Sequence, residues 1–370
     1  MEPQKILVAG VWESSPNLVE IRSPFDGHRV GTTYLATPEQ VERAAAGSVA
    51  GFNAMRTLGA WERGAILRTT AAKITERREE LAALLSAEAG KPIRDARAEI
   101  DRGALTFRLA AEEAERMIGE TIPLDLAPAS KGRLGITQRF PVGPVLGISP
   151  FNFPLNLAAH KVAPAIAVGC SMVLKPPSAD PLIMLKVAEI LVDAGLPAGG
   201  LSVIPTSRPD ADRLIEDERF KVLSFTGSPT VGWSLKGRAG KKRVILELGG
   251  NAACIVDATA DLSWAVKRSL VGSFAYAGQV CISVQRIFVH ESVADAFEQQ
   301  FAAGAAKLKK RSWSSPEQLA SWLYVSALSR EPAPAELKVA ASIVGAEISE
   351  QGIADLLWAV CMLPEFQTIR

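Results

Sequence analysis

One thiol stands in a short segment of small and apolar residues, GQVCIS, at positions 278–283. A cysteine thiolate is a nucleophile that forms covalent intermediates with carbonyl compounds, so Cys281 is a candidate catalytic residue. Free cysteines are also among the residues most often buried in protein cores, and a lone cysteine is therefore ambiguous. Residues elsewhere in the chain must decide between a nucleophile and a core residue.

Two polar residues follow apolar segments that are typical of strands. Glu247 ends the apolar part of VILELGG, residues 244–250, immediately before two glycines. A buried carboxyl there would have the raised pKa that a general base near neutrality requires, whereas a glutamate facing water would have no such role. Asn152 lies in ISPFNFP, residues 148–154, where its amide could donate to an oxyanion. Asparagine is also a common turn residue, so this alternative stays open.

A second group of residues could bind a phosphate or a ribose. The segment FTGSPTVG, residues 225–232, follows the strand-like KVLSF, and Ser228 and Pro229 suit the cap and first turn of a helix. The N–H groups at such a helix start attract phosphate, although the spacing differs from GxGxxG and many such turns are structural. Lys175 ends the strand-like SMVLK before two prolines. It is either a cation for a ribose or phosphate at the carboxyl edge of a sheet, or a solvated lysine.

The elements that must position these residues follow an α/β pattern. Residues 38–118 have apolar residues at helical spacing with Gly90 as a stop, which predicts a helical layer. Residues 119–140 predict a projecting β-hairpin, because two β-prone runs flank the turn-forming APASKG. From 141 to 248 short apolar strands alternate with amphipathic helices, which predicts a Rossmann-like, doubly wound parallel sheet. Ligands bind such sheets at the carboxyl ends of the strands.

Length and composition restrict the class of protein. The chain has 370 residues, 48% of them hydrophobic, so it can bury sizeable cores, and its net charge of +1 does not suggest a nucleic acid or a membrane surface as a partner. The four cysteines are far apart and form no CxxC pair, which argues against a disulfide framework and against a metal site. Because we find neither a signal-peptide pattern nor an apolar run of membrane-spanning length, we expect a cytoplasmic protein that acts on a small molecule.

Five motifs together resemble the NAD(P)-dependent aldehyde dehydrogenase superfamily over about residues 5–310: SPFNFP, LKPPS, FTGS, LELGGN and GQVC, in that family's order and close to its spacing. The resemblance implies that Cys281 is the nucleophile, Glu247 the general base and Asn152 the oxyanion donor. It also implies NAD or NADP as the cofactor, with Lys175 at the adenosine ribose. The other residues that it assigns to the cofactor are Ile148, Ser149, Pro150, Ser178, Gly227, Ser228, Gly232 and Leu248.

The implied reaction is the oxidation of an aldehyde to a carboxylic acid through a cysteine thioester. Hydride leaves the thiol adduct for the nicotinamide, and Glu247 then activates the water that hydrolyses the thioester. Ser178 stands where many NAD-preferring members have a glutamate, so NAD and NADP both stay open. The segments GETIPLD and FAYAGQVCISVQRIFVH are most similar to the branch that oxidises small oxygenated aldehydes, such as lactaldehyde, glyceraldehyde and semialdehydes.

The resemblance ends near Lys310, without the family's Glu-x-Phe motif or the final strand of its oligomerisation sheet. The remaining sequence is helical in pattern and resembles the end of a bacterial domain of unknown function, so we expect a chimera that arose by gene fusion, deletion or an assembly error. The helical tail would then have to cover apolar surface that the incomplete catalytic domain leaves exposed.

Four domains are therefore expected. They are a dinucleotide-binding domain (1–118 with 141–248), a hairpin of the oligomerisation sheet (119–140), the start of a catalytic domain (249–310) and a foreign helical tail (311–370). The family is oligomeric, but the state of this chain stays open. The alternative to an enzyme is a non-catalytic remnant that still binds a dinucleotide.

Overall fold

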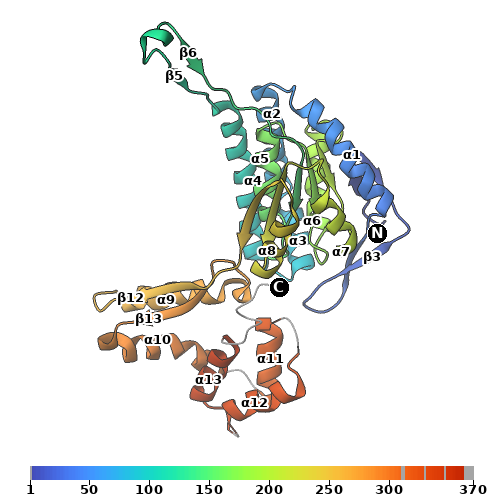
Figure 1. Ribbon diagram of the computed structural model, residues 1–370. Coiled ribbons are helices and arrows are strands. Elements are labelled where there is room, and N and C mark those ends of the chain that lie inside the picture. Colours follow the sequence, from blue (N-terminus) through green and yellow to red (C-terminus); the bar gives the residue numbers. More distant parts are fainter. Residues whose placement is uncertain (1, 310–312, 329–330, 346, 362–370) are drawn as a thin grey trace. The chain divides into compact units, whose positions relative to one another are not determined.

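The computed structural model describes residues 2–309, 313–328, 331–345 and 347–361. They fall into two compact units (Figure 1). The first unit is built from the residues up to 226 together with 230–247, and the second from 227–229 together with the residues from 248 onward. No helix among the described residues combines the length and the apolar character needed to cross a membrane.

A seven-stranded sheet forms the centre of the first unit. Its strands, in spatial order, are β11 (Arg243–Leu248), β10 (Val222–Gly227), β7 (Val145–Ile148), β8 (Met172–Lys175), β9 (Leu201–Val203), β1 (Ile6–Val8) and β2 (Val11–Glu13). The pairs β10·β7, β7·β8 and β8·β9 are parallel, as predicted, but β1 pairs antiparallel with both β9 and β2. The prediction of a wholly parallel sheet is therefore wrong at this edge. Ala9 and Gly10, both with positive φ, join β1 to β2 in a two-residue turn that only an antiparallel pair allows.

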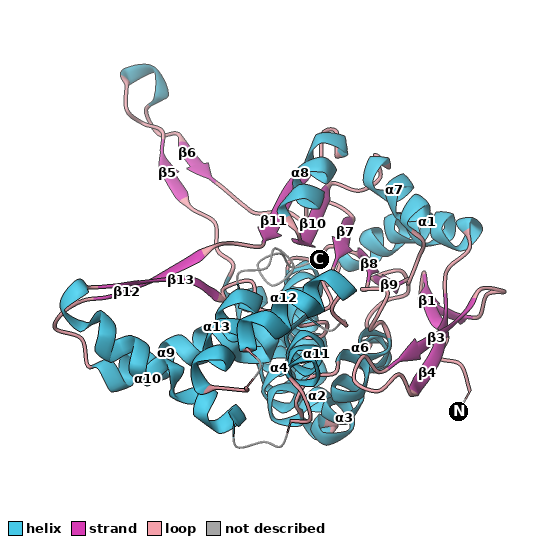
Figure 2. Ribbon diagram, turned by 90° about the horizontal axis from the view of Figure 1, so that it is seen from below, coloured by secondary structure: helices cyan, strands magenta, loops and turns pink. Residues whose placement is uncertain are grey.

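Helices cover both faces of this sheet (Figure 2). On one side α5 and α6 contact the strands and α2, α3 and α4 lie behind them, while α1, α7 and α8 lie on the other side. The predicted helical layer over 38–118 is present, and Gly90 ends α3 with a left-handed φ of 63°. The bounds are α1 Pro38–Met55, α2 Ala60–Glu76, α3 Arg78–Ala89, α4 Ile93–Arg116, α5 Asn156–Ala167, α6 Leu182–Asp193, α7 Arg208–Glu216 and α8 Pro229–Arg238.

Two hairpins complete the first unit. Strands β3 (Leu18–Arg22) and β4 (Arg29–Tyr34) form a separate two-stranded sheet that the sequence did not predict. Strands β5 (Thr121–Pro123) and β6 (Leu134–Ile136) form the predicted hairpin, which extends beyond the end of α4 (Figure 1). Every residue of β5 is exposed. The part of this hairpin in oligomerisation stays a prediction.

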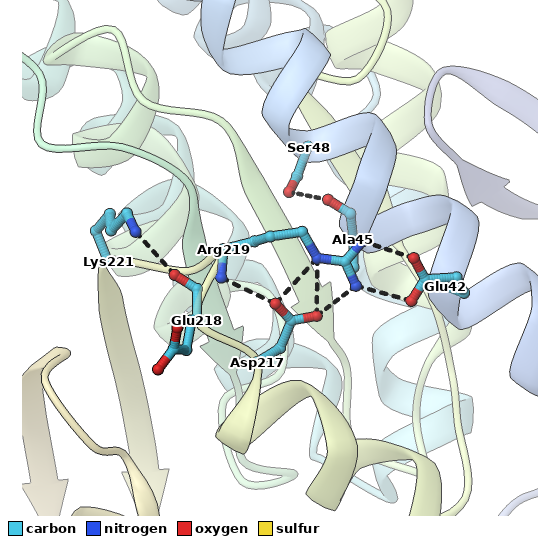
Figure 3. Close-up of polar contacts among 7 residues, drawn as sticks. All are labelled: Glu42, Ala45, Ser48, Asp217, Glu218, Arg219 and Lys221. Atoms are coloured by element: carbon cyan, nitrogen blue, oxygen red, sulfur yellow. Dashed lines mark hydrogen bonds and ion pairs between the residues drawn. The ribbon is translucent and has the colours of Figure 1, made fainter.

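Polar contacts connect α1 with the loop that precedes β10, where Arg219 lies (Figure 3), and with the residue just before β8. The Arg219 guanidinium donates to both carboxylate oxygens of Glu42, on α1, at 2.6 and 2.7 Å, and it also binds Asp217. Further along α1, the carbonyl of Ser48 accepts a hydrogen bond of 2.6 Å from the hydroxyl of Ser171, just before β8. Both the start of β8 and the loop that precedes β10 are thus tied to one helix.

A buried carboxyl from α3 fixes the start of α6. Glu88 accepts hydrogen bonds from the backbone N–H groups of Leu182 and Ile183, at 2.6 and 3.0 Å. Burial raises the pKa of Glu88 to about 8, although these two donors act in the opposite direction. Burial also raises the pKa of Asp180, and the nearby charge of Glu88 adds to this effect. The loop 176–181, which carries Ser178, is therefore held at its far end by α3.

The second unit starts with two parallel strands, β12 (Ala252–Val256) and β13 (Val284–Val289). Helices α9 (Leu262–Phe274) and α10 (Glu291–Lys309) cover one face of this pair, where Val256, Val266 and Phe297 are buried. The residues that alternate with these along the strands point away from this core, and Ile255 is 80% exposed. Apolar surface thus stays uncovered on β12 and β13.

The helical tail has a core of its own. It consists of α11 (Pro316–Leu328), α12 (Pro334–Val344) and α13 (Glu350–Cys361), which bury Leu319, Leu323 and Ile353 together. The hydroxyl of Ser315 caps the start of α11 by accepting a hydrogen bond of 3.3 Å from the N–H of Gln318. The tail does not cover the apolar side chain of Ile255. The side chain of Cys361, the fourth cysteine, lies outside the described residues, and so does Lys310.

Because of Glu88, the free energy of unfolding should fall as the pH rises. Its pKa is about 8 in the folded protein against an ordinary value of 4.5, so between these pH values the folded state binds more protons than the unfolded state. Its contribution to the free energy of unfolding is therefore full below pH 4.5 and is lost as the pH rises through 8. Urea unfolding at several pH values should show a smaller loss in Glu88→Gln than in the parent. Identical pH slopes for the two proteins would contradict this assignment.

Candidate active site

The first cofactor candidates meet at the carboxyl ends of β7 and β8. In the parallel register Ile148 lies opposite Lys175, and the N–H of Ser149 donates to the Lys175 carbonyl at 3.2 Å. On the other side of β7, Phe225 of β10 also lies opposite Ile148. The loops after three adjacent strands therefore leave the sheet from one edge, as the sequence predicted.

Lys175 and Ser178 belong to the loop after β8. Lys175 is half-buried, and burial lowers the pKa of its ammonium. Within the described residues its one hydrogen bond is a long contact of 3.5 Å from Nζ to the carbonyl of Pro176. Ser178 is exposed. Partial burial thus argues against the alternative of a solvated lysine, and the ammonium keeps donors for a ligand at this edge, while its role at a ribose stays a prediction.

The predicted helix start after β10 is confirmed. Strand β10 ends at Gly227, and α8 begins at Pro229, directly after Ser228. The N–H of Gly249, which follows Leu248 at the end of β11, donates to the Gly227 carbonyl at 3.3 Å. The start of α8 presents backbone N–H groups and a partial positive charge, the chemistry that binds phosphate. Gly232, the remaining candidate, is buried within α8.

Asn152 lies in the turn between β7 and α5. The residue is buried, and its carbonyl accepts a hydrogen bond of 2.6 Å from Nζ of Lys91. Pro150, another candidate from the same turn, is buried as well. Both readings of Asn152, as a turn residue and as an oxyanion donor, agree with this position, and its catalytic role stays a prediction.

Glu247 differs from the expectation of a buried carboxylate. It lies near the end of β11, at the edge of the sheet, and its side chain is exposed. Alternate residues of β11 are exposed, and Glu247 lies on the exposed face of this strand. The expected burial of this carboxyl is therefore wrong, and the alternative of a glutamate that faces water fits this position. Its role as a general base stays a prediction based on the motif.

The sequence analysis missed Lys161 on α5. This lysine is 6% exposed, and its Nζ donates to the hydroxyls of Thr226 and Ser224 on β10, at 2.7 and 3.3 Å. Burial lowers its pKa to about 8, an effect that the charge of Glu247 opposes. A lysine within the apolar run NLAAHKVAPAIAVG was the available signal, because a buried ammonium needs partners.

Cys281 lies in the second unit, in the turn between the short helix η2 (Ala275–Gly278) and β13. It is half-buried, so it is not a fully buried core residue. Tyr276 and Ala277 have left-handed φ values of 50° and 53°, a costly conformation for residues other than glycine. The hydroxyl of Ser283 anchors the turn by donating to the Ser273 carbonyl at 3.1 Å. The N–H of Cys281 donates to no partner in the described parts of the chain. The nucleophilic role stays a prediction.

No metal site accompanies these residues in the part of the chain that the structure describes. Three or more His, Cys, Asp or Glu side chains do not come together there as a ligand set.

Known proteins match most of this chain. The 3-sulfolactaldehyde dehydrogenase of Priestia aryabhattai is 40% identical over 304 residues, which cover 82% of this chain and 63% of that protein. The lactaldehyde dehydrogenase of Methanocaldococcus jannaschii is 44% identical over 259 residues, which cover 69% of this chain and 55% of that protein. The chain thus spans less than two thirds of these relatives.

Solved structures agree with the sequence comparison. Aldehyde dehydrogenase 21 of Physcomitrella patens, in complex with the reaction product succinate, has a TM-score of 0.80 and 46% identity, covering 83% of this chain and 65% of that one. The NADP-dependent glyceraldehyde-3-phosphate dehydrogenase of Bacillus halodurans, complexed with NADP, has a TM-score of 0.80 and 33% identity over the same shares. The Aldehyde dehydrogenase family matches residues 12–318, slightly beyond the expected boundary near residue 310. The resemblance found in the sequence is confirmed, and the chain belongs to the aldehyde dehydrogenase family.

Proposed function

We propose that this chain oxidises a small oxygenated aldehyde to the carboxylic acid with NAD or NADP, through a thioester on Cys281. The family match over residues 12–318 carries the proposal, because it includes the motifs around Cys281, Glu247 and Asn152. The names of the relatives, which are dehydrogenases of lactaldehyde and 3-sulfolactaldehyde, support a small oxygenated substrate.

The carboxyl edge of the first unit supplies residues that fit a dinucleotide. The half-buried Lys175 keeps donors for ribose hydroxyls, since its one contact within the described residues is long. The start of α8 suits the pyrophosphate, whose charge it complements. Ser178 is exposed and neutral, so it would not repel a 2′-phosphate, and both cofactors fit. When bound, the cofactor supplies the hydride acceptor.

Three residues of this chain, Cys281, Asn152 and Glu247, have different roles in the proposed reaction. The thiolate of Cys281 adds to the aldehyde carbon, and the amide of Asn152 and the N–H of Cys281 donate to the oxyanion that forms. An N–H that has no partner in the described residues suits this task, because it needs no bond broken first. After hydride loss, Glu247 takes a proton from the water that hydrolyses the thioester. The carboxylate of Glu247, near the end of β11, is exposed and therefore accessible to water.

Replacing Cys281 or Glu247 should affect different steps. Cys281→Ala should abolish hydride transfer, because no thiol adduct forms, whereas the control Cys254→Ala should keep the parent's rate. Glu247→Gln should keep a first-turnover burst of reduced cofactor and slow the steady state by roughly a hundredfold, since thioester hydrolysis stalls. Rapid-mixing absorbance of the reduced nicotinamide separates the two. Parent-like turnover in Cys281→Ala would refute the nucleophile, and cofactor binding without any parent turnover would identify a dinucleotide-binding remnant.

Ser178→Glu should shift the cofactor preference towards NAD. A carboxylate at this exposed position would accept from the 2′-hydroxyl of NAD and repel the 2′-phosphate of NADP, so the loss should fall mainly on NADP. Calorimetric titration of both cofactors measures the ratio of the two affinities. If this ratio is the same as in the parent, Ser178 does not face the ribose.

A further inference from the structure

A buried ion pair lies directly behind Asn152 in the first unit. Lys91, in the link between α3 and α4, and Glu99, on α4, have fully buried side chains, with 2.5 Å between Nζ and Oε2. Nζ of Lys91 also donates to the carbonyl of Asn152 at 2.6 Å and lies 3.9 Å from the centre of the Phe153 ring. One ammonium therefore contacts two consecutive residues of the turn.

Glu99 holds the other end of the same turn. Its Oε1 accepts hydrogen bonds from the backbone N–H groups of Leu155 and Asn156, at 3.0 and 3.1 Å. These residues lie at the start of α5, where backbone donors lack partners within the helix and a negative charge is favourable. The ion pair thus spans the turn from Asn152 to Asn156.

Further residues of helix α4 contact the same turn. At Gly103, one helical turn after Glu99, a Cβ atom would lie 2.1 Å from Cδ2 of Leu155, so a larger residue would require that side chain to shift. The hydroxyl of Thr106, further along α4, makes a long contact of 3.5 Å with Oδ1 of Asn156. Three residues on one face of α4 therefore meet the same two residues of the turn.

Stability alone does not account for such a pair. Burial lowers the pKa of Lys91, and the charge of Glu99 opposes this shift, so each charge needs the other. Apolar side chains of similar volume are often equal or superior to a buried ion pair in stability. Apolar side chains cannot make directed hydrogen bonds, however. The hydrogen bonds of Lys91 and Glu99 end on the backbone of the turn that carries Asn152.

We propose that Lys91 and Glu99 are positioning residues, which fix the backbone from Asn152 to Asn156 and so aim the Asn152 amide at the oxyanion. The inference rests on the proposed function, in which Asn152 is the oxyanion donor. A donor that is displaced by about 1 Å costs up to roughly a hundredfold in rate, so a rigid support for this turn has a direct kinetic effect.

The double variant Lys91→Met/Glu99→Met separates positioning from stability. Two apolar side chains fill the space without leaving a buried charge, but the N–H groups of Leu155 and Asn156 lose their acceptor, so the urea midpoint should fall while the protein still folds. Asp101→Asn is the matched control, because Asp101 also lies on α4 but forms an exposed ion pair with Arg78, at 2.7 and 2.8 Å. Both variants are compared with the parent as full chains.

Hydrogen exchange, measured by mass spectrometry, reports on the backbone hydrogen bonds of this turn. The measurement does not require enzyme activity. The double variant should exchange at least about tenfold faster in peptides covering 155–157, because the Leu155 and Asn156 donors lose their acceptor. Peptides from β8 and β9 should keep the parent's rates, and the control should match the parent throughout. If the double variant does not fold, Glu99→Asp replaces it, since its shorter carboxylate keeps the charge but withdraws from both donors. Unchanged exchange at 155–157 in the folded variant overturns the inference.

Kinetic measurements then test whether the ion pair orients the Asn152 amide. In the double variant hydride transfer should slow by about tenfold to a hundredfold, while the dissociation constant of the cofactor stays at the parent's value. A parent-like hydride rate would overturn the positioning role. If the parent itself transfers no hydride, the proposed function fails, and the exchange experiment still decides whether the ion pair fixes the turn.

Discussion

Parallel hydrogen bonding among β7, β8 and β10 is the constraint on which the rest of the first unit depends. The register places Ile148 between Lys175 on one side and Phe225 on the other, so β7 and β8 end at the same level and β10 continues two residues further, to Gly227. Each loop that leaves this edge carries a different kind of candidate: an amide at Asn152, a cation at Lys175 with an exposed hydroxyl, and a helix start. A shift in register would separate these groups, because none of them is fixed by its neighbours in sequence alone.

Buried polar side chains support this edge from within. Glu88 binds the start of α6, Glu99 binds the start of α5, and Lys161 binds two hydroxyls of β10. In each case a side chain from one element reaches the backbone or hydroxyls of another, with donors and acceptors matched as burial requires. The core behind the candidate site is therefore polar and directional, in contrast to the apolar core between α2, α4 and α5.

Local patterns predicted the elements well. The helices over 38–118 and the alternating strands and helices over 141–248 were found, because their periodicity and their Gly and Pro boundaries are encoded in neighbouring residues. Strands β1 and β2 were missed, since three residues are too few for a period to show, and their turn at Ala9 and Gly10 reversed the expected direction of the edge.

Tertiary contacts explain what the sequence did not predict about the site. The motifs placed Asn152, Lys175 and Ser228 at strand ends or helix starts, as the structure confirms. The exposure of Glu247 depends on which face of β11 other elements cover, which the strand's own residues do not reveal. The partners of Lys91 and Lys161 lie 8 to 65 residues away along the chain, so their burial and pairing become visible only in the fold.

Calorimetric titration of NADP into the parent and into Lys175→Met tests the central claim, that this strand edge binds a dinucleotide. The account predicts saturable binding at one site in the parent. It predicts affinity about tenfold to a hundredfold lower in the variant, because a charged donor to the ribose is worth about 1.5–3 kcal/mol. No heat of binding in the folded parent, or equal affinities in the two proteins, would contradict it.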